Sequence, residues 1–242
     1  MYAQTSVQLL MQLEREGYTA AEQDVIRAAY RLAAELFSGQ FLGTGRTQIA
    51  HVIGTASVLA SVRAPAEVVA AALVHNAYDT GDFGDGRHGA SRARRRYVRA
   101  ALGADVEERV YRFAVVKPEV YARAARFEPD AIGDALDVVD RQALSLVLAD
   151  TLEHRLNHED ASNHGDIMAA RADRLGLPEL ATAIGRAFDV PVSRTFSLDL
   201  ALDGWPRRGV MAPRSYRRNM RLVLRQKLLE NAARLRSVAR RK

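Results

Sequence analysis

Apolar residues recur at steps of three and four positions along most of the chain, the spacing that places them on one face of an α-helix. No stretch alternates apolar and polar residues for long enough to make a sheet. The pattern therefore predicts an all-α protein. Its helices are expected over residues 1–19, 20–36, 47–62, 65–76, 91–102, 105–116, 118–127, 141–157, 166–175, 179–188 and 214–241.

Three segments interrupt this pattern. Residues 39–45 contain three glycines, residues 78–90 are rich in Gly and Asp, and residues 190–213 contain three prolines, so each is expected to be a loop or irregular. The helix over 65–76 is apolar almost all round and should lie at the centre of the bundle. We expect an N-terminal helix (1–19), a helical domain (20–190), and an irregular segment followed by a basic C-terminal helix (191–242).

Charge is distributed unevenly along the chain. The net charge is +6, yet the segment from Trp205 onward has 13 Lys or Arg against one acid, so it carries +12 and the remainder sums to −6. We expect the basic helix to dock on the domain; an acidic partner or a membrane surface would be alternatives. No nucleic-acid motif accompanies the basic residues and aromatic residues are scarce, which argues against nucleic acid as a partner.

Composition bounds the compartment and the chemistry. Hydrophobic residues make up 48% of the chain, enough for a sizeable core, and there are no cysteines, which excludes disulfides and thiolate metal sites. The N-terminal segment lacks a signal-peptide pattern, and no apolar run approaches the roughly 18 residues of a membrane span. We therefore expect a cytoplasmic protein without a membrane span, and a homo-oligomer is an open alternative.

Four positions carry candidate chemistry: His51, the pair His75–Asn76, Asp79 and Asp150. A histidine or aspartate alone on a helix is more often a core or surface residue than a ligand. Packed helices nevertheless bring such residues together in a bundle core. Imidazole and carboxylate groups suit divalent metals such as Mn, Fe or Zn, so the sequence suggests a metal pocket, although the same residues could work without a metal.

The motifs around these positions resemble those of the (p)ppGpp hydrolases, a branch of the HD superfamily of metal-dependent phosphohydrolases. The stretches LFSGQFLGTGRTQIAHV and AAALVHNAYDT are similar to the segments that carry that family's first ligands, and VLADTLEHRL is similar to the segment that supplies its last one. The resemblance implies an HD-like helical bundle, and it implies a divalent-metal site with a phosphorylated small-molecule substrate. The implied metal ligands are His51, His75, Asn76 and Asp150, and Asp79 would be an acid of the pocket.

A second resemblance is to a group of HD-like domains of bacteria and plants. Those domains read His-x-x-Gly-Thr after the second helix and Leu-x-His-x-x-Tyr-x-Thr after the third. This chain has HVIGT at 51–55 and LVHNAYDT at 73–80. This resemblance implies the fold and the pocket but no particular reaction.

The chain departs from the hydrolase pattern at several positions. The second residue of the His-Asp pair is Asn76, whose neutral amide cannot bridge two metals as a carboxylate does, which argues against a two-metal enzyme. The acid that assists water attack in the hydrolases is either replaced by Tyr78 or lost, because the segment is one residue shorter here. Phe37 and Leu42 replace a first-helix histidine and a guanine-stacking arginine, which argues against specific (p)ppGpp recognition.

Other polar groups could complete the pocket. Asp150, His154 and His158 are spaced by four residues and so lie on one helix stripe, where His154 could be an extra ligand or a general base. The loop at 79–89 is either a lid or an ordinary surface loop. The basic run at 92–96 is either a phosphate contact or a solvated helix face.

Three functions are compatible with these residues. The first is an HD-like metal-binding hydrolase of a phosphorylated, nucleotide-like small molecule, with Asp79 or His154 acting on water. The second is a biosynthetic lyase, isomerase or cyclase that uses Tyr78, Asp79 and His154, together with His51 and His75, as acids and bases. The third is a degenerate HD domain that senses a ligand or binds a partner. Fold alone does not separate them, because function resides in the site.

Overall fold

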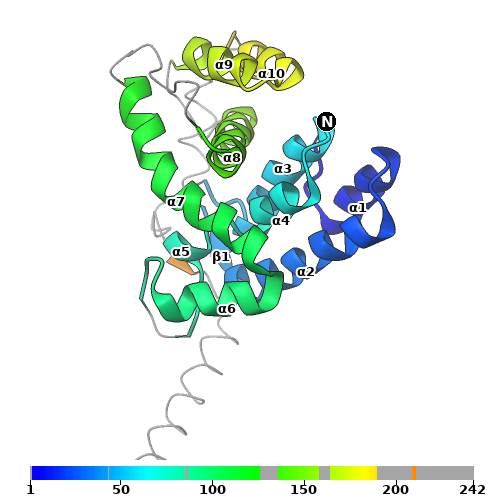
Figure 1. Ribbon diagram of the computed structural model, residues 1–242, viewed down its shortest axis with the longest axis vertical. Helices are drawn as coiled ribbons and strands as arrows, with labels where there is room; N and C mark the ends of the chain where they lie inside the picture. The colour runs from blue at the N-terminus through cyan, green and yellow to red at the C-terminus, as the bar shows by residue number, and fades with distance from the viewer. Residues whose placement is uncertain are drawn as a thin grey trace, which may run out of the picture.

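The computed structural model describes residues 2–42, 44–84, 87–125, 136–157 and 164–189, together with the pair 209–210. Within these residues the chain is a bundle of helices, which confirms the all-α prediction (Figure 1). The elements are α1 (Ser6–Arg15), α2 (Ala20–Phe37), β1 (Gln40–Phe41), α3 (Gln48–Ser61), α4 (Ala66–Val74), α5 (Ala77–Thr80), α6 (Arg92–Leu102), α7 (Ala104–Ala125), α8 (Val138–Leu156), α9 (Gly165–Arg174), α10 (Pro178–Asp189) and β2 (Gly209–Val210).

Helix α4 is the centre of the bundle, as its all-round apolar sequence predicted. It contacts α2, α3, α7 and α8, and each of its apolar residues is buried. Helix α8 packs against α3 and α7, while α9 and α10 pack on each other and lie on the side of α8 away from α6 (Figure 1). This packing brings the first half of α3, the end of α4 and the second half of α8 to one place inside the molecule.

The N-terminal helix is part of the same core. Leu9 and Leu13 of α1 are buried in it, and the Gln12 side-chain amide donates to the Ser57 carbonyl of α3 at 3.0 Å. Thr5 caps α1 by accepting a hydrogen bond from the backbone of the third helical residue, whose side chain reaches back to the cap. The first predicted segment therefore forms its helix and joins the domain.

One helix boundary was predicted wrongly. We expected two helices, over 105–116 and 118–127, but α7 is continuous and has Pro118 in its interior. Proline at such a position removes one backbone hydrogen bond and disfavours the helix. Four buried residues, three before Pro118 and one after it, fall at helical spacing, so packing of one face against α4 and α8 outweighs the local penalty. They are Val106, Val110, Phe113 and Val120.

Smaller differences arise from local hydrogen bonds. Helix α8 begins at Val138 rather than near 141, because the Asp137 carboxylate accepts from the Asp140 backbone N–H at 2.7 Å and caps it. The first residues of the predicted loop at 78–90 form the short helix α5. Strand β1 pairs antiparallel with β2, a two-residue sheet that the pattern did not predict. The predicted basic helix at 214–241 lies outside the described residues.

Candidate metal centre

Three helices place three buried donor atoms around one point. His51 comes from the first half of α3, His75 from the residue that ends α4, and Asp150 from α8, and all three side chains are almost fully buried. The Nε2 atoms of the two histidines are 3.2 Å apart. Each of them is also 3.2 Å from the same oxygen, Oδ1 of Asp150. The structure thus brings together the three residues that the sequence motifs singled out.

Hydrogen bonds on the opposite ring nitrogens orient the two imidazoles. Nδ1 of His75 lies 2.7 Å from the Ala72 carbonyl, which can only accept, so Nδ1 carries the proton. Nδ1 of His51 lies 2.6 Å from Oε2 of Glu153, a carboxylate oxygen that likewise accepts. In a neutral ring protonated at Nδ1, the Nε2 atom carries an unshared electron pair. Two such nitrogen atoms and Oδ1 of Asp150 therefore face one another at the centre. Such a group is stable only with a proton or a cation among them.

Without a metal, protons supply that charge. Burial disfavours protonated His51, but hydrogen bonding and attraction by Asp150 and Glu153 outweigh this and raise the pKa of His51 to about 9. Burial lowers the pKa of His75, so that ring stays neutral. Burial would also raise the pKa of Asp150, but the charges of Lys117, His154 and His75 hold it well below its usual range. Without a metal, His51 is therefore protonated and His75 is neutral, and both lie next to an ionised carboxylate.

The carboxylate of Asp150 is surrounded by nitrogen atoms of neighbouring side chains. Both of its oxygens are buried without a hydrogen-bond partner of acceptable geometry. Nevertheless, Nζ of Lys117 is 2.8 Å from Oδ2, and Nε2 of His154 is 3.5 Å from Oδ1. A buried carboxylate with several nitrogen atoms close by, but without a hydrogen bond of good geometry, is compatible with an ion position among these groups.

The donor set fits a divalent ion. Donors about 2.1 Å from one ion lie roughly 3.0–3.4 Å apart for angles between octahedral and tetrahedral values. The three observed separations, each 3.2 Å, lie inside that range. His51, Asp150 and His154 also offer ligand atoms that all lie within 4.8 Å of one another. The described part of the chain thus contains a group of two or three histidines and one carboxylate whose ligand atoms are close enough together to hold one metal ion.

His154 lies in the site, as the helix stripe with Asp150 predicted. Its side chain is partly exposed, and its ring tilts over the His51 ring with 4.5 Å between centroids. The side chains of His154 and Lys117 are partly exposed to solvent, whereas those of His51, His75 and Asp150 are fully buried. The third member of the predicted stripe, His158, lies outside the described residues.

The affinity for a divalent metal should rise with pH between about 6 and 8. His51 holds a proton below its pKa of about 9, and a metal needs the lone pair which that proton occupies. Each displaced proton weakens binding roughly tenfold per pH unit below the pKa. Calorimetric titration with Zn²⁺ in buffers of different ionisation enthalpy would count the protons released. An affinity that stays constant over this range would contradict the protonated state of His51.

Asn76, which the resemblance implied as a metal ligand, lies next to the centre. It is 8% exposed, and its Nδ2 lies 3.4 Å from Nε2 of His51. An amide in this place presents a neutral oxygen or an N–H to the site, where an aspartate would present a charge. The candidate metal position therefore has the carboxylate of Asp150 on one side. On the other side it has the Asn76 amide, where the hydrolases that this sequence resembles have a second carboxylate.

Asn76→Asp should raise the affinity for Mn²⁺ by about tenfold or more, because the charge count of the ligands tunes cation affinity over orders of magnitude. Titration of the metal-free wild type and variant in parallel would measure it. Equal affinities would show that residue 76 does not face the ion.

A cavity of about 470 Å³ adjoins the centre. His75, Asn76 and Lys117 belong both to the cluster and to the cavity wall, so the donor cluster adjoins the buried side of the cavity. Asp79 and His88 are exposed and contribute to its wall, which Tyr111 and Phe113 complete with aromatic surface. Asp79 is thus a pocket acid on the open side of the cavity and not a member of the donor cluster.

Tyr78 lines the cavity but its hydroxyl is engaged elsewhere. The hydroxyl donates to Oε1 of Glu107 in α7 at 2.8 Å. The Glu107 carboxylate is fully buried and also accepts hydrogen bonds from Arg95 and Arg99. Burial and this hydrogen bond raise the pKa of Tyr78 well above its ordinary value. The arrangement favours a structural role for Tyr78 over the acid–base role that its position in the motif suggested.

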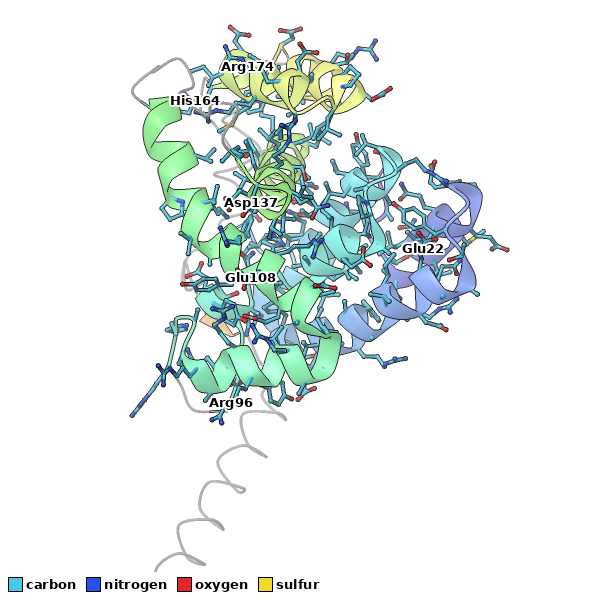
Figure 2. The ribbon with its side chains drawn as sticks, viewed as in Figure 1. Glu22, Arg96, Glu108, Asp137, His164 and Arg174 are labelled. Carbon is cyan, nitrogen blue, oxygen red and sulfur yellow. The ribbon has the colours of Figure 1, made fainter. Side chains whose placement is uncertain are left out.

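The basic run at 92–96 divides into two kinds of residue. Arg94 is buried, with its guanidinium donating to the Gly89 carbonyl, and Arg95 binds Glu107 and Glu108. Arg96 lies on the outer face of α6, away from the bundle (Figure 2). None of these three lines the cavity. The run is therefore part structural and part solvated, and the phosphate contact considered for it is not supported.

Three charged residues of the site were not found from the sequence. Glu153 binds His51, Arg46 binds Glu153, and Lys117 binds Asp150. Glu153 follows Asp150 by three residues and so shares its helix face, a signal that the spacing already contained. Arg46 and Lys117 reach the site from a loop and from the middle of another helix, and their positions follow no local pattern.

Comparison with known protein families finds one match, to a family described as a domain of unknown function, DUF6817, over residues 33–117. The matched part runs from the second half of α2 into α7 and contains His51, His75 and Asn76 but not Asp150. None of the curated proteins matches the chain. Among the described helices there is none with the length and apolar character needed to cross a membrane.

Proposed function

We propose that the protein is a mononuclear metal-dependent hydrolase, built as an HD-like helical domain, which acts on a phosphorylated small molecule. The observation that carries the proposal is the triangle of buried donor atoms, 3.2 Å on each side, which adjoins a cavity of about 470 Å³. Ligand pockets commonly have volumes of this order. The resemblance to HD phosphohydrolases motivates the reaction type.

Each residue of the cluster has a defined task in this proposal. His51, His75 and Asp150 would hold the ion, and His154, at its partly exposed position, would complete the donor set or take a proton from water. A bound divalent ion would polarise a phosphoryl oxygen and lower the pKa of water. Because Asn76 is neutral, the site should hold one ion and work more slowly than relatives with a second carboxylate there.

The cavity wall supports the choice of an anionic, partly apolar substrate. The ammonium group of Lys117 lies on the wall beside the centre and is suited to a phosphate oxygen. Tyr111 and Phe113 provide a flat apolar surface for the rest of the molecule. Asp79, on the open side, could accept a proton or a hydrogen bond from a hydroxyl or amine of the substrate. A nucleotide-like molecule combines these groups.

The test is a screen of phosphorylated nucleotides and sugars with Mn²⁺, Co²⁺ and Zn²⁺, following elemental analysis of protein purified without chelator. We expect close to one transition-metal ion per chain and release of phosphate or pyrophosphate that EDTA stops. Protein that takes up no metal and releases no phosphate from any of these substrates would refute the hydrolase proposal.

A second candidate is an acid–base enzyme that needs no metal. The observation in its favour is that Lys117, 2.8 Å from Asp150, already neutralises the buried carboxylate, while the Nε2 atoms of His51 and His75 lie 3.2 Å apart beside it. Such a site could move protons on a substrate in the same cavity, as a lyase or isomerase does. Turnover of a substrate that persists in EDTA would favour this function over the first.

A further inference from the structure

We propose that Glu153 is a positioning residue that orients the His51 ring so that Nε2 faces the site. Arg46 fixes the Glu153 carboxylate, and Gly54 leaves the space in which the Glu153 side chain lies. The inference rests on the metal site proposed above, to which it adds the outer groups. Glu153 is 1% exposed, and its Oε2 lies 2.6 Å from Nδ1 of His51. One face of α8 thus supplies both Asp150 and the carboxylate that orients the facing histidine.

Both oxygens of the Glu153 carboxylate are held. Arg46, in the turn before α3, contacts Oε1 through Nη1 and donates to Oε2 through Nη2 at 2.8 Å. The side-chain amide of Asn157, one helical turn further along α8, donates to Oε1 at 3.0 Å. A paired guanidinium balances the charge of the buried carboxylate and fixes its plane. The Glu153 carboxylate, which accepts the hydrogen bond from Nδ1 of His51, is therefore held in one orientation.

Gly54 leaves the space in which this carboxylate lies. A Cβ atom added to Gly54 would be 2.5 Å from Oε1, 2.8 Å from Cγ and 3.0 Å from Cδ of Glu153. Glycine is disfavoured inside a helix, and α3 is helical on both sides of this position. The close approach explains the residue: His51 and Gly54, three apart on α3, form one contact surface for the Glu153 side chain.

This arrangement has a direct consequence for the site. A carboxylate that accepts from Nδ1–H keeps the proton off Nε2 when the ring is neutral and directs Nε2 toward Asp150 and His75. Loss of such an outer partner typically lowers metal affinity by about 10–100-fold. An added Cβ at Gly54 would meet Glu153, which is not one of the proposed ligands. Gly54→Ala should therefore weaken metal binding by displacing Glu153.

The experiment is a double-mutant cycle on the full chain. Zn²⁺ affinity is measured by competition with a chromophoric chelator, and the visible spectrum of the Co²⁺ form reports the ligand geometry. Gly54→Ala and Glu153→Ala should each lose about 10–100-fold in affinity. The double variant should lose no more than Glu153→Ala alone, because the clash then has no partner. Glu153→Gln, whose amide oxygen can still accept, should recover part of the loss and a spectrum close to that of the wild type.

Gly185→Ala in α10 is the matched control, since a Cβ there meets no atom within 4 Å, and it should bind like the wild type. Gly54→Ala with unchanged affinity and Co²⁺ spectrum would overturn the proposal, as would additive losses in the double variant. If Gly54→Ala fails to fold, Arg46→Met, which releases the carboxylate, takes its place with the same expected direction.

A second measurement does not need a metal. In ¹⁵N-labelled metal-free protein, a His51 Nδ1–H resonance shifted downfield by the carboxylate should appear and should move in Glu153→Gln. If the wild type binds no metal but shows this resonance, the proposed function fails and the positioning role stands. A His51 ring that is protonated at Nε2 alone overturns the positioning role, whatever the metal does.

Discussion

Metal-dependent phosphate release should disappear when His75 is replaced by alanine. The change removes one corner of the donor triangle, whose other two atoms, on His51 and Asp150, each lie 3.2 Å from Nε2 of His75. Loss of an outer-shell partner alone typically lowers metal affinity by about 10–100-fold, so loss of a ligand should exceed about 100-fold. The remaining pair of donors, one protonated histidine and one carboxylate paired with Lys117, would form an internal ion pair instead.

The measurement needs a check of folding, because His75 is buried and packs edge-on against Phe113 with 4.8 Å between ring centroids. His75→Gln keeps most of the volume and serves as the second variant, with circular dichroism to confirm the helices. His88→Ala, at an exposed position on the same cavity wall, should retain metal binding. Wild-type turnover in both His75 variants, with the metal still bound, would remove His75 from the site.

Glu107→Ala should destabilise the protein by about 3–5 kcal/mol, the usual effect of breaking a buried ion pair by removing one partner. Glu107 is fully buried. Its carboxylate accepts from the Tyr78 hydroxyl at 2.8 Å, from Arg95 Nε at 2.6 Å and from Arg99 Nη2 at 2.6 Å. Alanine would leave a buried hydroxyl without an acceptor and two guanidinium groups without their shared anion.

Urea unfolding with linear extrapolation would give this free energy of unfolding. Glu108→Ala is the matched control, because Glu108 is the next residue, pairs with Arg95 and Arg112, and is partly exposed. Surface ion pairs contribute about 0–1 kcal/mol, so this control should change little. Equal small losses in the two variants would mean that the Glu107 network is not a structural anchor of α5 and α7.

Local sequence patterns predicted most of the helices. Apolar residues at helical spacing lie within a few positions of one another, so they can be read without knowing the fold. The pattern failed at Pro118, where the local preference for a break is overruled by contacts of α7 with α4 and α8. Packing over a whole helix face involves many residues, and a single unfavourable position does not decide it.

The site was predicted in part for the same reason. His51, His75 and Asp150 stand in motifs that resemble a known ligand pattern, and the structure places their side chains together. The motif did not indicate that the Tyr78 hydroxyl would bind Glu107, or that Lys117 would reach Asp150. Tyr78 and Lys117 each meet a partner about thirty residues away in the chain, so the relevant spacing is not in the local sequence.

The sequence by itself determined the helical class, the burial of α4 and the residue types of the donor cluster, because each follows from local periodicity or from side-chain chemistry. Only the tertiary structure decided which ring nitrogen faces the centre. That choice depends on Glu153, which is 102 positions from His51 in the chain and 2.6 Å from it in space. The tertiary structure also explains why residue 54 is glycine, because the Glu153 side chain of α8 lies against α3 at this position. Helix propensity acts within one turn, whereas contacts between helices depend on how the whole chain packs.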